Sequence, residues 1–454
     1  MARNVARNSA QRPGSHGGRV VRGFEAGRKL PGGYARAVER RSLLGLSTRK
    51  FSMFRRSILA MFAVMAIVLG GVVVSAPAGA VVDAAVIVPS PNAGTSRDRL
   101  LSVSCVSATD CVAVGTTEAG SVVKTLAMVW DGSVWTVVSS PNVGTSNDQL
   151  RSVSCVSVTE CVAVGYTKNG LPYQTLAMVW DGSVWTVVSS PNVGIYADEL
   201  ESVSCVSVNE CVAVGRTFNG SISETLAMVW DGTVWSIVPS PNAVAGSDFL
   251  KSVSCVSATE CVAVGYTDIL AVETLAMVWD GTVWSIVPSP NAGISRDELA
   301  SVSCVSVNEC VAVGYTFNGL ALETLVMVWD GTVWSIVPSP NAGTGSNDLF
   351  SVSCVSTSDC VAVGNTFNGS ALETLVMVWD GTVWSIVPSP NAGTGSNELQ
   401  SVSCVSVSEC VAVGYSDTGN NVFETLVLSL TGPEPAPTTT TTAPSDQVAP
   451  AFTG

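Results

Sequence analysis

The sequence predicts an all-β fold, a seven-bladed β-propeller with four antiparallel strands per blade, from three observations. The segment SVSCVSATDCVAVG at 102–115 returns in seven copies, spaced 49 or 50 residues apart. Each of the first six copies holds four short stretches in which apolar and polar residues alternate, as in half-buried strands. Charged residues make up only 13% of the chain, which excludes a long helical or coiled-coil protein.

Within a copy, the four predicted strands follow one another as a meander. In single-letter code they are SVSCV, CVAVGYT, TLAMVWD and VWSIVPS, and we name them A to D. The A-to-B turn is a tight segment such as SATD and the C-to-D turn is the Asp-Gly of WDG, and both suit antiparallel hairpins. Four antiparallel strands in about 50 residues are typical of a propeller blade. A β-solenoid, the competing architecture, has shorter repeats as a rule and needs end caps.

The two ends of the repeat region predict how the ring closes. Residues 84–96 (AAVIVPSPNAGTS) have the sequence of a D strand and its exit loop, but no A, B or C strand precedes them. The seventh copy stops at 424–432 (ETLVLSLTG) and lacks a D strand. We expect Ala84–Ser90 to pair with Thr425–Leu430. The N-terminal strand then completes the last blade and leaves no unpaired inner edge.

The 14 cysteines form pairs with five residues between the members of each pair. An export signal, an even count and a hairpin that places both members on adjacent strands predict one structural disulfide per blade. A zinc site is disfavoured, because each pair offers two thiolates and the one histidine, His16, precedes the repeats. The expected bridges are Cys105–Cys111, Cys155–Cys161, Cys205–Cys211, Cys255–Cys261, Cys304–Cys310, Cys354–Cys360 and Cys404–Cys410.

The N-terminal region predicts export. Residues 1–56 form a basic leader that holds 14 of the 22 Lys and Arg against two acids, so its net charge is +12 and that of the remainder is −26. Residues 57–80 contain the uncharged run ILAMFAVMAIVLGGVVV followed by the small residues of SAPAGA, which is the pattern of a signal peptide. An uncleaved N-terminal anchor is the alternative. A start at Met53 would give a signal of ordinary length, with the preceding residues an over-extended start.

The expected location is therefore the cell exterior, with the protein either secreted, held at the cell surface or anchored in the membrane by 57–80. Residues 84–432 form the propeller, and 433–454, rich in Pro and Thr, form a disordered tail. The acidic body excludes nucleic acid as a partner, and membrane contact would come only through an uncleaved N-terminal segment. We expect a monomer.

The turns of a meander alternate between the two ends of its strands, so the loops fall on two faces. The A-to-B and C-to-D turns share one face, which barely changes among the copies and which we call the constant face. The B-to-C and D-to-A loops share the other, the variable face, where the B-to-C loop ranges from TTEAGSVVK to YSDTGNNVFE. Because loops on a rigid scaffold carry function, the variable face is the predicted binding surface. Free drift after duplication is the alternative explanation.

An acid precedes each A strand on the variable face. If A is the innermost strand, these carboxylates ring one mouth of the central channel, where they would bind Ca²⁺ or repel anions. Capping of a turn explains each acid equally well. We expect no other cofactor, no catalytic residue and no further metal ligand. The acids are Asp98, Asp148, Asp198, Asp248, Asp297, Asp348 and Glu398.

The WDG hairpins and the repeat units carry a resemblance to known families. The 50-residue blade with its WDG-turn-Trp hairpin resembles Kelch-type and Asp-box propellers, and the SVSCVSxxxCVAVG units are similar to secreted actinobacterial repeat proteins without a settled activity. The resemblance covers 84–432 and implies the fold. It implies no catalytic residue, because WDGTVW does not reproduce the S-x-D-x-G-x-x-W order of Asp-box sialidases and the copper-binding histidines of Kelch oxidases are absent from the repeats.

Together these features predict an exported, non-catalytic binding or adhesion module that presents a variable loop face on a disulfide-bonded propeller. Glycans, cell-wall polymers and surface proteins are the expected partners. Two alternatives stay open at this point. One is a polysaccharide-active hydrolase or lyase that uses variable-face carboxylates, and the other is a structural protein of a surface coat.

Overall fold

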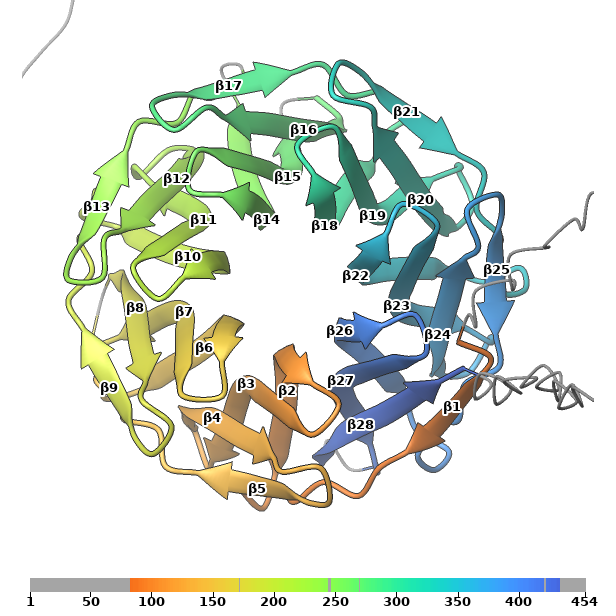
Figure 1. Ribbon diagram of the computed structural model, residues 1–454, viewed down its shortest axis with the longest axis horizontal. Coiled ribbons are helices and arrows are strands. Elements are labelled where there is room, and N and C mark those ends of the chain that lie inside the picture. The colour runs from red at the N-terminus through yellow and green to blue at the C-terminus, as the bar shows by residue number, and fades with distance from the viewer. Residues whose placement is uncertain (1–81, 171, 244–245, 269, 420–421, 433–454) are drawn as a thin grey trace, which may run out of the picture. The chain divides into compact units, whose positions relative to one another are not determined.

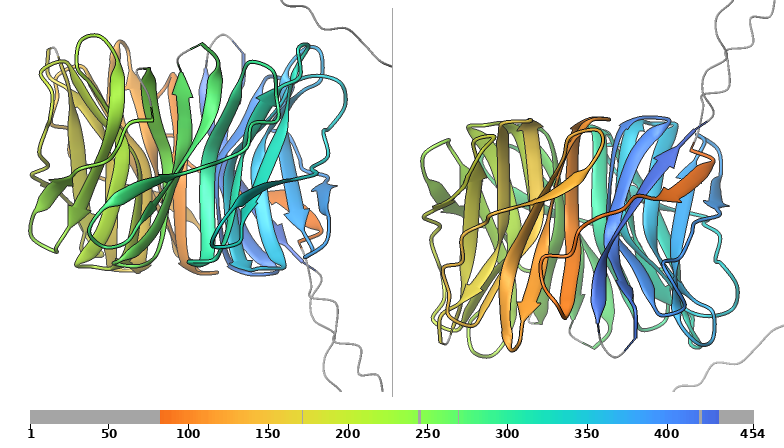
Figure 2. Two further views of the ribbon diagram at one scale, coloured as in Figure 1. Left: turned by 90° about the horizontal axis from the view of Figure 1, so that it is seen from above. Right: turned by 90° about the horizontal axis from the view of Figure 1, so that it is seen from below.

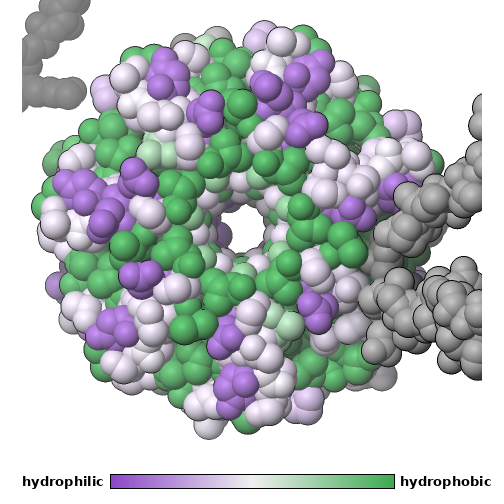
Figure 3. Space-filling model, in the orientation of Figure 1, coloured by the Kyte–Doolittle hydropathy of each residue, from purple (hydrophilic) through white to green (hydrophobic). Residues whose placement is uncertain are grey.

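A computed structural model describes residues 82–170, 172–243, 246–268, 270–419 and 422–432, and the predicted leader, signal and tail lie outside these ranges. The described chain is all-β and forms a β-propeller of repeated antiparallel sheets around a central axis (Figure 1 and Figure 2). The space-filling view shows an opening along that axis (Figure 3). Within the described ranges, no helix has the length and apolar character needed to cross a membrane.

The strands follow the predicted order A to D in each copy, with A innermost (Figure 1). The A strands are β2 (Arg97–Ser107), β6 (Asn147–Ser157), β10 (Ala197–Ser207), β14 (Ser247–Ser257), β18 (Asp297–Ser306), β22 (Asn347–Ser356) and β26 (Asn397–Ser406). The B strands are β3 (Asp110–Ala119), β7 (Glu160–Lys168), β11 (Glu210–Phe218), β15 (Glu260–Asp268), β19 (Glu309–Phe317), β23 (Asp359–Phe367) and β27 (Glu409–Asp417). The C strands are β4 (Val122–Trp130), β8 (Tyr173–Trp180), β12 (Ser223–Trp230), β16 (Val272–Trp279), β20 (Leu322–Trp329), β24 (Leu372–Trp379) and β28 (Phe423–Thr431). The outer D strands are β5 (Trp135–Val138), β9 (Trp185–Val188), β13 (Trp235–Val238), β17 (Trp284–Val287), β21 (Trp334–Val337) and β25 (Trp384–Val387).

The N-terminal strand β1 (Ala84–Ile87) lies beside the C strand of the last copy (Figure 1). It pairs antiparallel with β28, from Ala84 opposite Thr431 to Ile87 opposite Leu428. Beyond β1, the backbone amide of Val88 donates to the carbonyl of Val427 at 2.9 Å. The pairing therefore covers the stretch expected from the sequence and supplies β28 with the outer neighbour that its own copy lacks.

Serine hydroxyls join neighbouring innermost strands. The amides of Val352 and Cys354 on β22 donate to the hydroxyls of Ser301 and Ser303 on β18, at 3.2 and 3.0 Å. These amides lie on the open edge of the sheet, where the strand has no backbone partner, so a hydroxyl of the next copy satisfies each donor. Every neighbouring pair of A strands makes the same two bonds, and we call this set the serine ladder.

The hydrophobic core lies between sheets rather than within one. In one cluster, Leu150, Met178 and Trp180 of the second copy pack on Val112 and Val114 of the first. Equivalent clusters follow around the ring, and one of them joins the first copy to the last through β2–β5 and β27–β28. The tryptophans of the WDG hairpins lie in these clusters or pack against them.

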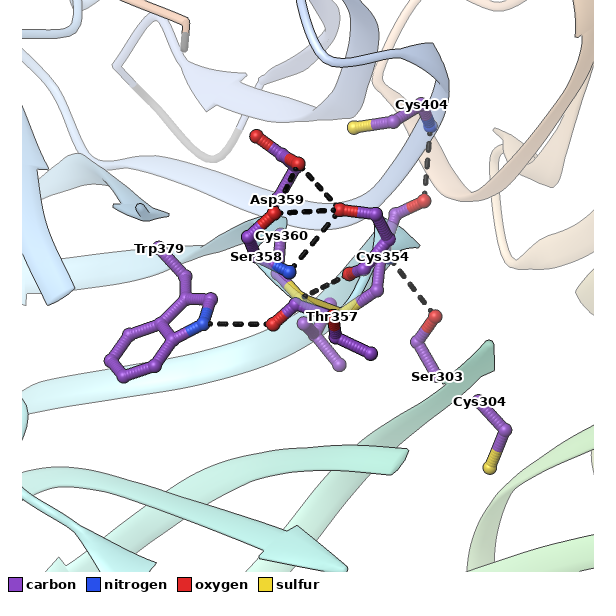
Figure 4. The surroundings of a disulfide bond; sticks show 12 residues. Ser303, Cys304, Cys354, Thr357, Ser358, Asp359, Cys360, Trp379 and Cys404 are labelled. Atoms are coloured by element: carbon purple, nitrogen blue, oxygen red, sulfur yellow. Dashed lines mark hydrogen bonds between the residues drawn. A yellow bond between two sulfur atoms is a disulfide. The ribbon is translucent and has the colours of Figure 1, made fainter. Parts of the chain in front are cut away.

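All of the predicted disulfides are present, which accounts for the 14 cysteines. Figure 4 shows the surroundings of Cys354–Cys360, where the Trp379 indole donates to the carbonyl of Thr357 at 3.1 Å. On the opposite side of the bridge, the Cys354 amide donates to Ser303 in the serine ladder. Each disulfide therefore fixes an A-to-B turn at the point where the ladder and the inter-sheet core meet.

The serine ladder makes a prediction about stability. Replacing Ser301 with Ala leaves the buried amide of Val352 without an acceptor, which should lower the free energy of unfolding by about 1–3 kcal/mol. Urea denaturation followed by tryptophan fluorescence measures this value. Ser221→Ala serves as the matched control because Ser221 is exposed and bonds Asn219 through its backbone amide. Equal stabilities of the two variants would contradict the role given to the ladder.

Candidate functional site

One position of each A strand varies among copies although its neighbours are nearly constant. It directly precedes the buried leucine of the strand, and each residue there pairs across to the B strand with another variable residue. We call these fourteen residues, together with the residue that follows each buried leucine, the mouth ring, because they lie where the innermost strands begin, at the variable face. The cross-strand pairs are Arg99–Thr116, Gln149–Tyr166, Glu199–Arg216, Phe249–Tyr266, Glu298–Tyr315, Asp348–Asn365 and Glu398–Tyr415.

A β-bulge adds further side chains to the mouth ring. The register shifts between Leu100 and Ser102, so Leu101 is an extra residue on β2. Gly115 lies opposite, and a Cβ there would overlap the carbonyl oxygen of Arg99, so the bulge requires glycine. In other copies the extra residue is charged, as in Arg151, Glu201 and Lys251.

The predicted acids do not form one ring of carboxylates. Asp98, Asp148, Asp198, Asp248 and Asp297 are at most 2% exposed and lie one residue before the mouth ring, on the opposite side of the strand. Their side chains cap the D-to-A loops: Asp98 accepts from the amide of Gly94 at 3.0 Å and Asp248 accepts from that of Ala243 at 3.0 Å.

The last two predicted acids occupy the next position along the strand. In these copies, Asn347 and Asn397 take the capping role and accept from the amides of Ala342 and Ala392 at 2.9 and 2.8 Å. Asp348 and Glu398 consequently belong to the mouth ring. The expected ring is thus divided between two sides of the A strands, and the described residues contain no group of three or more His, Cys, Asp or Glu placed to hold a metal ion.

Ion pairs organise one half of the mouth ring. The guanidinium of Arg151 contacts Glu201 of the next copy at 3.0 and 3.1 Å, and that of Arg216 contacts Glu199 at 2.8 and 3.1 Å. Burial alone would raise the pKa of Glu201, but Arg151 and Lys251 outweigh it and lower this pKa to about 2. The carboxylate of Glu201 therefore stays ionised and links two neighbouring sheets.

Carboxyl groups with raised pKa values occupy the other half. Burial raises the pKa of Asp348 to about 6, and the charges of Glu398 and Glu298 act in the same direction against Arg296. Burial raises the pKa of Glu398 as well. Among the described residues, Oδ1 of Asp348 and Oδ1 of its cross-strand neighbour Asn365 are both buried and accept no hydrogen bond. A protonated Asp348 would be the donor that this pair lacks.

Aromatic rings line the mouth between the charged groups. Phe249 stacks on Tyr266 with ring centroids 4.5 Å apart, and the Arg216 guanidinium lies 5.2 Å from the Phe249 centroid. Arg99 lies over Tyr415 and Phe423 of the last copy at 5.0 and 4.4 Å. Arrays of Tyr, Phe and Arg are the composition that binding surfaces favour, so the mouth ring is the candidate ligand site.

Arg296, Glu298 and Tyr315 form a charged triad within this site. The guanidinium contacts Glu298 at 2.6 and 3.0 Å and the Tyr315 hydroxyl at 3.1 Å, while that hydroxyl donates to Glu298. Burial and the Glu298 charge raise the pKa of Tyr315. The tyrosine therefore keeps its proton and remains a hydrogen-bond donor throughout the physiological pH range.

Comparison with known proteins adds little to this geometry. No protein-family description matches the chain, and no curated protein is similar to it. Among solved structures, YCF48 bound to D1 peptide resembles it with a TM-score of 0.47 and 13% identity, over 77% of this chain and 97% of that one.

The mouth ring predicts two opposite pH dependences of stability. The folded-state pKa of Glu201 is about 2 against an ordinary 4.5, so its contribution is present above pH 4.5 and is lost as the pH falls toward 2. The folded-state pKa of Asp348 is about 6 against 3.8, so the fold gains stability as the pH falls from 6 toward 4.

Asp348→Asn should therefore raise the free energy of unfolding at pH 8 by on the order of 1 kcal/mol, allowing for solvent screening, and leave it unchanged at pH 4. Glu201→Gln should lower it at pH 8, because Arg151 loses its partner. Urea titrations of both variants at the two pH values measure these effects. The same sign for both variants at pH 8 would contradict the assignment.

Proposed function

We propose that this chain is an exported, non-catalytic binding module whose ligand site is the mouth ring on the variable face. The observation that carries the proposal is the contrast between a repeated scaffold and one set of positions, on the A and B strands, where charged, aromatic and uncharged polar residues replace one another among the copies. A structural role alone would not require Arg, Tyr, Phe, Glu and Asp to alternate around one mouth.

The side chains of the mouth ring favour a hydroxyl-rich ligand such as a glycan or cell-wall polymer. Aromatic rings provide faces on which sugar rings stack, and the paired carboxylate and guanidinium groups supply acceptors and donors that are already oriented. The site contains equal numbers of basic and acidic groups, so it has no net charge that would select a strongly ionic polymer. The basic groups are Arg99, Arg151, Arg216, Lys251 and Arg296, and the acidic groups are Glu199, Glu201, Glu298, Asp348 and Glu398. A surface protein is the alternative partner.

The disulfides support a location outside the cell. One bridge in every copy fits an oxidising compartment, since cytosolic reductants keep such thiols reduced. The signal-like residues 57–80 provide the route of export. We therefore propose that the protein is secreted or held at the cell surface.

We also propose that the seven repeat copies form seven blades, closed into a ring by β1. The pairing of β1 with β28 supports closure. So do the hydrogen bonds that two amides of β2 donate to the hydroxyls of Ser401 and Ser403, because neighbouring copies are connected in the same way elsewhere. A closed ring removes the exposed sheet edges that invite aggregation.

Deletion of residues 82–92 tests closure. Loss of β1 exposes the edge of β28, so the truncated protein should unfold at lower urea concentration and form soluble aggregates, both visible by size-exclusion chromatography coupled to light scattering. A synthetic peptide of residues 82–92 should restore the monomer. A monomeric truncated protein with unchanged stability would contradict closure by this strand.

Ligand binding tests the proposed site. Residues 81–454 should bind selectively on an array of glycans and cell-wall polymers, and Arg216→Gln or Glu298→Gln should weaken the affinity about tenfold by breaking oriented ion pairs. The matched control is Glu309→Gln, the same kind of change on the constant face. Equal affinity of mouth and control variants would contradict the site, and binding only to surface proteins would exclude the glycan ligand.

One observation favours a polysaccharide hydrolase as the second candidate function. Burial and the nearby Glu398 charge raise the pKa of Asp348 to about 6. A carboxyl group with a raised pKa can act as a general acid near neutral pH. Release of reducing ends from a bound polymer, abolished by Asp348→Asn, would establish this function instead of the binding module.

A further inference from the structure

Every copy places at least one carboxylate on the constant face. An acid stands directly before the second cysteine of each copy, and the first six copies add the Asp of WDG in the C-to-D turn. None of the eight Lys and Arg within 82–432 lies on this face, because all of them occupy the half of the sheets toward the variable face. The constant face is therefore strongly acidic.

Cavities open on this face between neighbouring sheets. Two of them have volumes of about 550 Å³ each, and they lie at equivalent places between the second and third copies and between the fifth and sixth. One is lined by Glu309, Asp330 and Trp329, and the other has Glu160, Asp181 and Trp180 at the same positions. A smaller cavity between the first and second copies has Asp110, Asp131 and Trp130 at these positions.

The cavities combine an apolar wall with an ionised rim. Val328, Trp329 and the half-cystines Cys310 and Cys354 form the wall of one cavity. At its rim, Asp330 accepts from the Thr332 hydroxyl and amide and from the Val333 amide, and these bonds lower its pKa. Those bonds all use Oδ1 of Asp330, and none of them uses Oδ2.

Exposed valines lie in the C-to-D turns, where their amides bond the aspartates at the cavity rims. Val333 is 53% exposed, and Val184 at the equivalent turn is 54% exposed. Figure 3, which views the constant face, shows hydrophobic and hydrophilic residues side by side on it. A ligand that meets this face would thus contact apolar and anionic groups in alternation.

We infer that the cavities of the constant face bind the Lys and Arg side chains of a cationic protein partner, a function separate from that of the mouth ring. These side chains have an apolar stem and a cationic head, which match the apolar wall and the carboxylate rim. Repetition between neighbouring copies lets several cationic side chains of one partner bind at once, which strengthens a weak single contact.

Other occupants fit this face less well. A second copy docking by the same face would bring carboxylates against carboxylates. A metal ion would need a cluster of ligands, and the described residues hold no group of three or more His, Cys, Asp or Glu placed for one. Charge complementarity therefore selects a polycationic partner.

Binding of an oligolysine peptide to residues 81–454, measured by isothermal titration calorimetry, tests this inference. Glu160→Gln, Asp181→Asn, Glu309→Gln and Asp330→Asn are combined in one variant, because Gln and Asn retain the acceptor oxygens that hold the turns. Affinity should fall about tenfold, and the dependence on salt should weaken. Chelation of divalent cations should change nothing.

The control variant removes the same charge from the opposite half of the sheets, through Glu224→Gln, Glu273→Gln, Glu323→Gln and Glu373→Gln. It should bind oligolysine within about twofold of the original protein, since these groups lie far from the cavities. An equal loss in both variants would overturn the inference, because attraction would then come from net charge alone. Failure of the parent protein to bind, or a requirement for divalent cations, would overturn it too.

A second variant tests the apolar part of the contact. Val184→Ser and Val333→Ser change exposed side chains, so the fold should be retained, as checked by thermal unfolding. Oligolysine affinity should fall about two- to threefold, because the stems lose apolar contact. Unchanged affinity would show that the valines take no part and would contradict the proposed mode of binding.

Discussion

Hydrogen bonds from edge amides to serine hydroxyls hold the innermost strands together, and the rest of the structure depends on them. The innermost strand of a propeller sheet has no backbone partner on its inner side, so its amides would otherwise be buried without acceptors. Ser301 and Ser303 supply the acceptors for β22, and every copy repeats the arrangement. The repeated SVSC sequence is therefore explained by bonding between copies rather than by chemistry at a catalytic site.

This ladder leaves the beginnings of the same strands free to vary. Once Ser102 and Ser104 fix the neighbouring strand and Leu100 fills the core, the residue before that leucine has no shared structural duty. The copies use this position for Arg, Gln, Glu, Phe and Asp, and the B-strand partner changes with it. Variation is thus concentrated at the proposed ligand site and is absent from the serines that join neighbouring strands.

Much of the fold could be predicted from the sequence because its signals are local and repeated. Alternating apolar residues, the Asp-Gly turns and the spacing of Cys354 and Cys360 each specify a hairpin without reference to distant parts of the chain. The pairing of residues 84–90 could also be predicted, because the last copy lacks a D strand and β28 therefore has no outer partner of its own. Leader, signal and tail lie outside the described residues, so those predictions are unchanged.

The candidate site was harder to predict because it depends on which way single side chains point. Moving one residue along a strand reverses the side that a side chain occupies. Asp98 and Asp348 look equivalent in the sequence, yet Asp98 caps a loop and Asp348 joins the mouth ring. The useful signal was available in the B strands, where Tyr166, Arg216 and Asn365 replace one another in otherwise constant segments. Variation within strands, rather than in loops, is the signal that points to the candidate site.

The central claim is that ligand binds at the mouth ring. Hydrogen–deuterium exchange of residues 81–454, with and without the polymer selected on the array, tests it most directly. Slower exchange in the first residues of the A strands and the last residues of the B strands, with no change in the A-to-B turns, is the result that our account predicts. Protection confined to the constant face, or spread evenly over all strands, would contradict it.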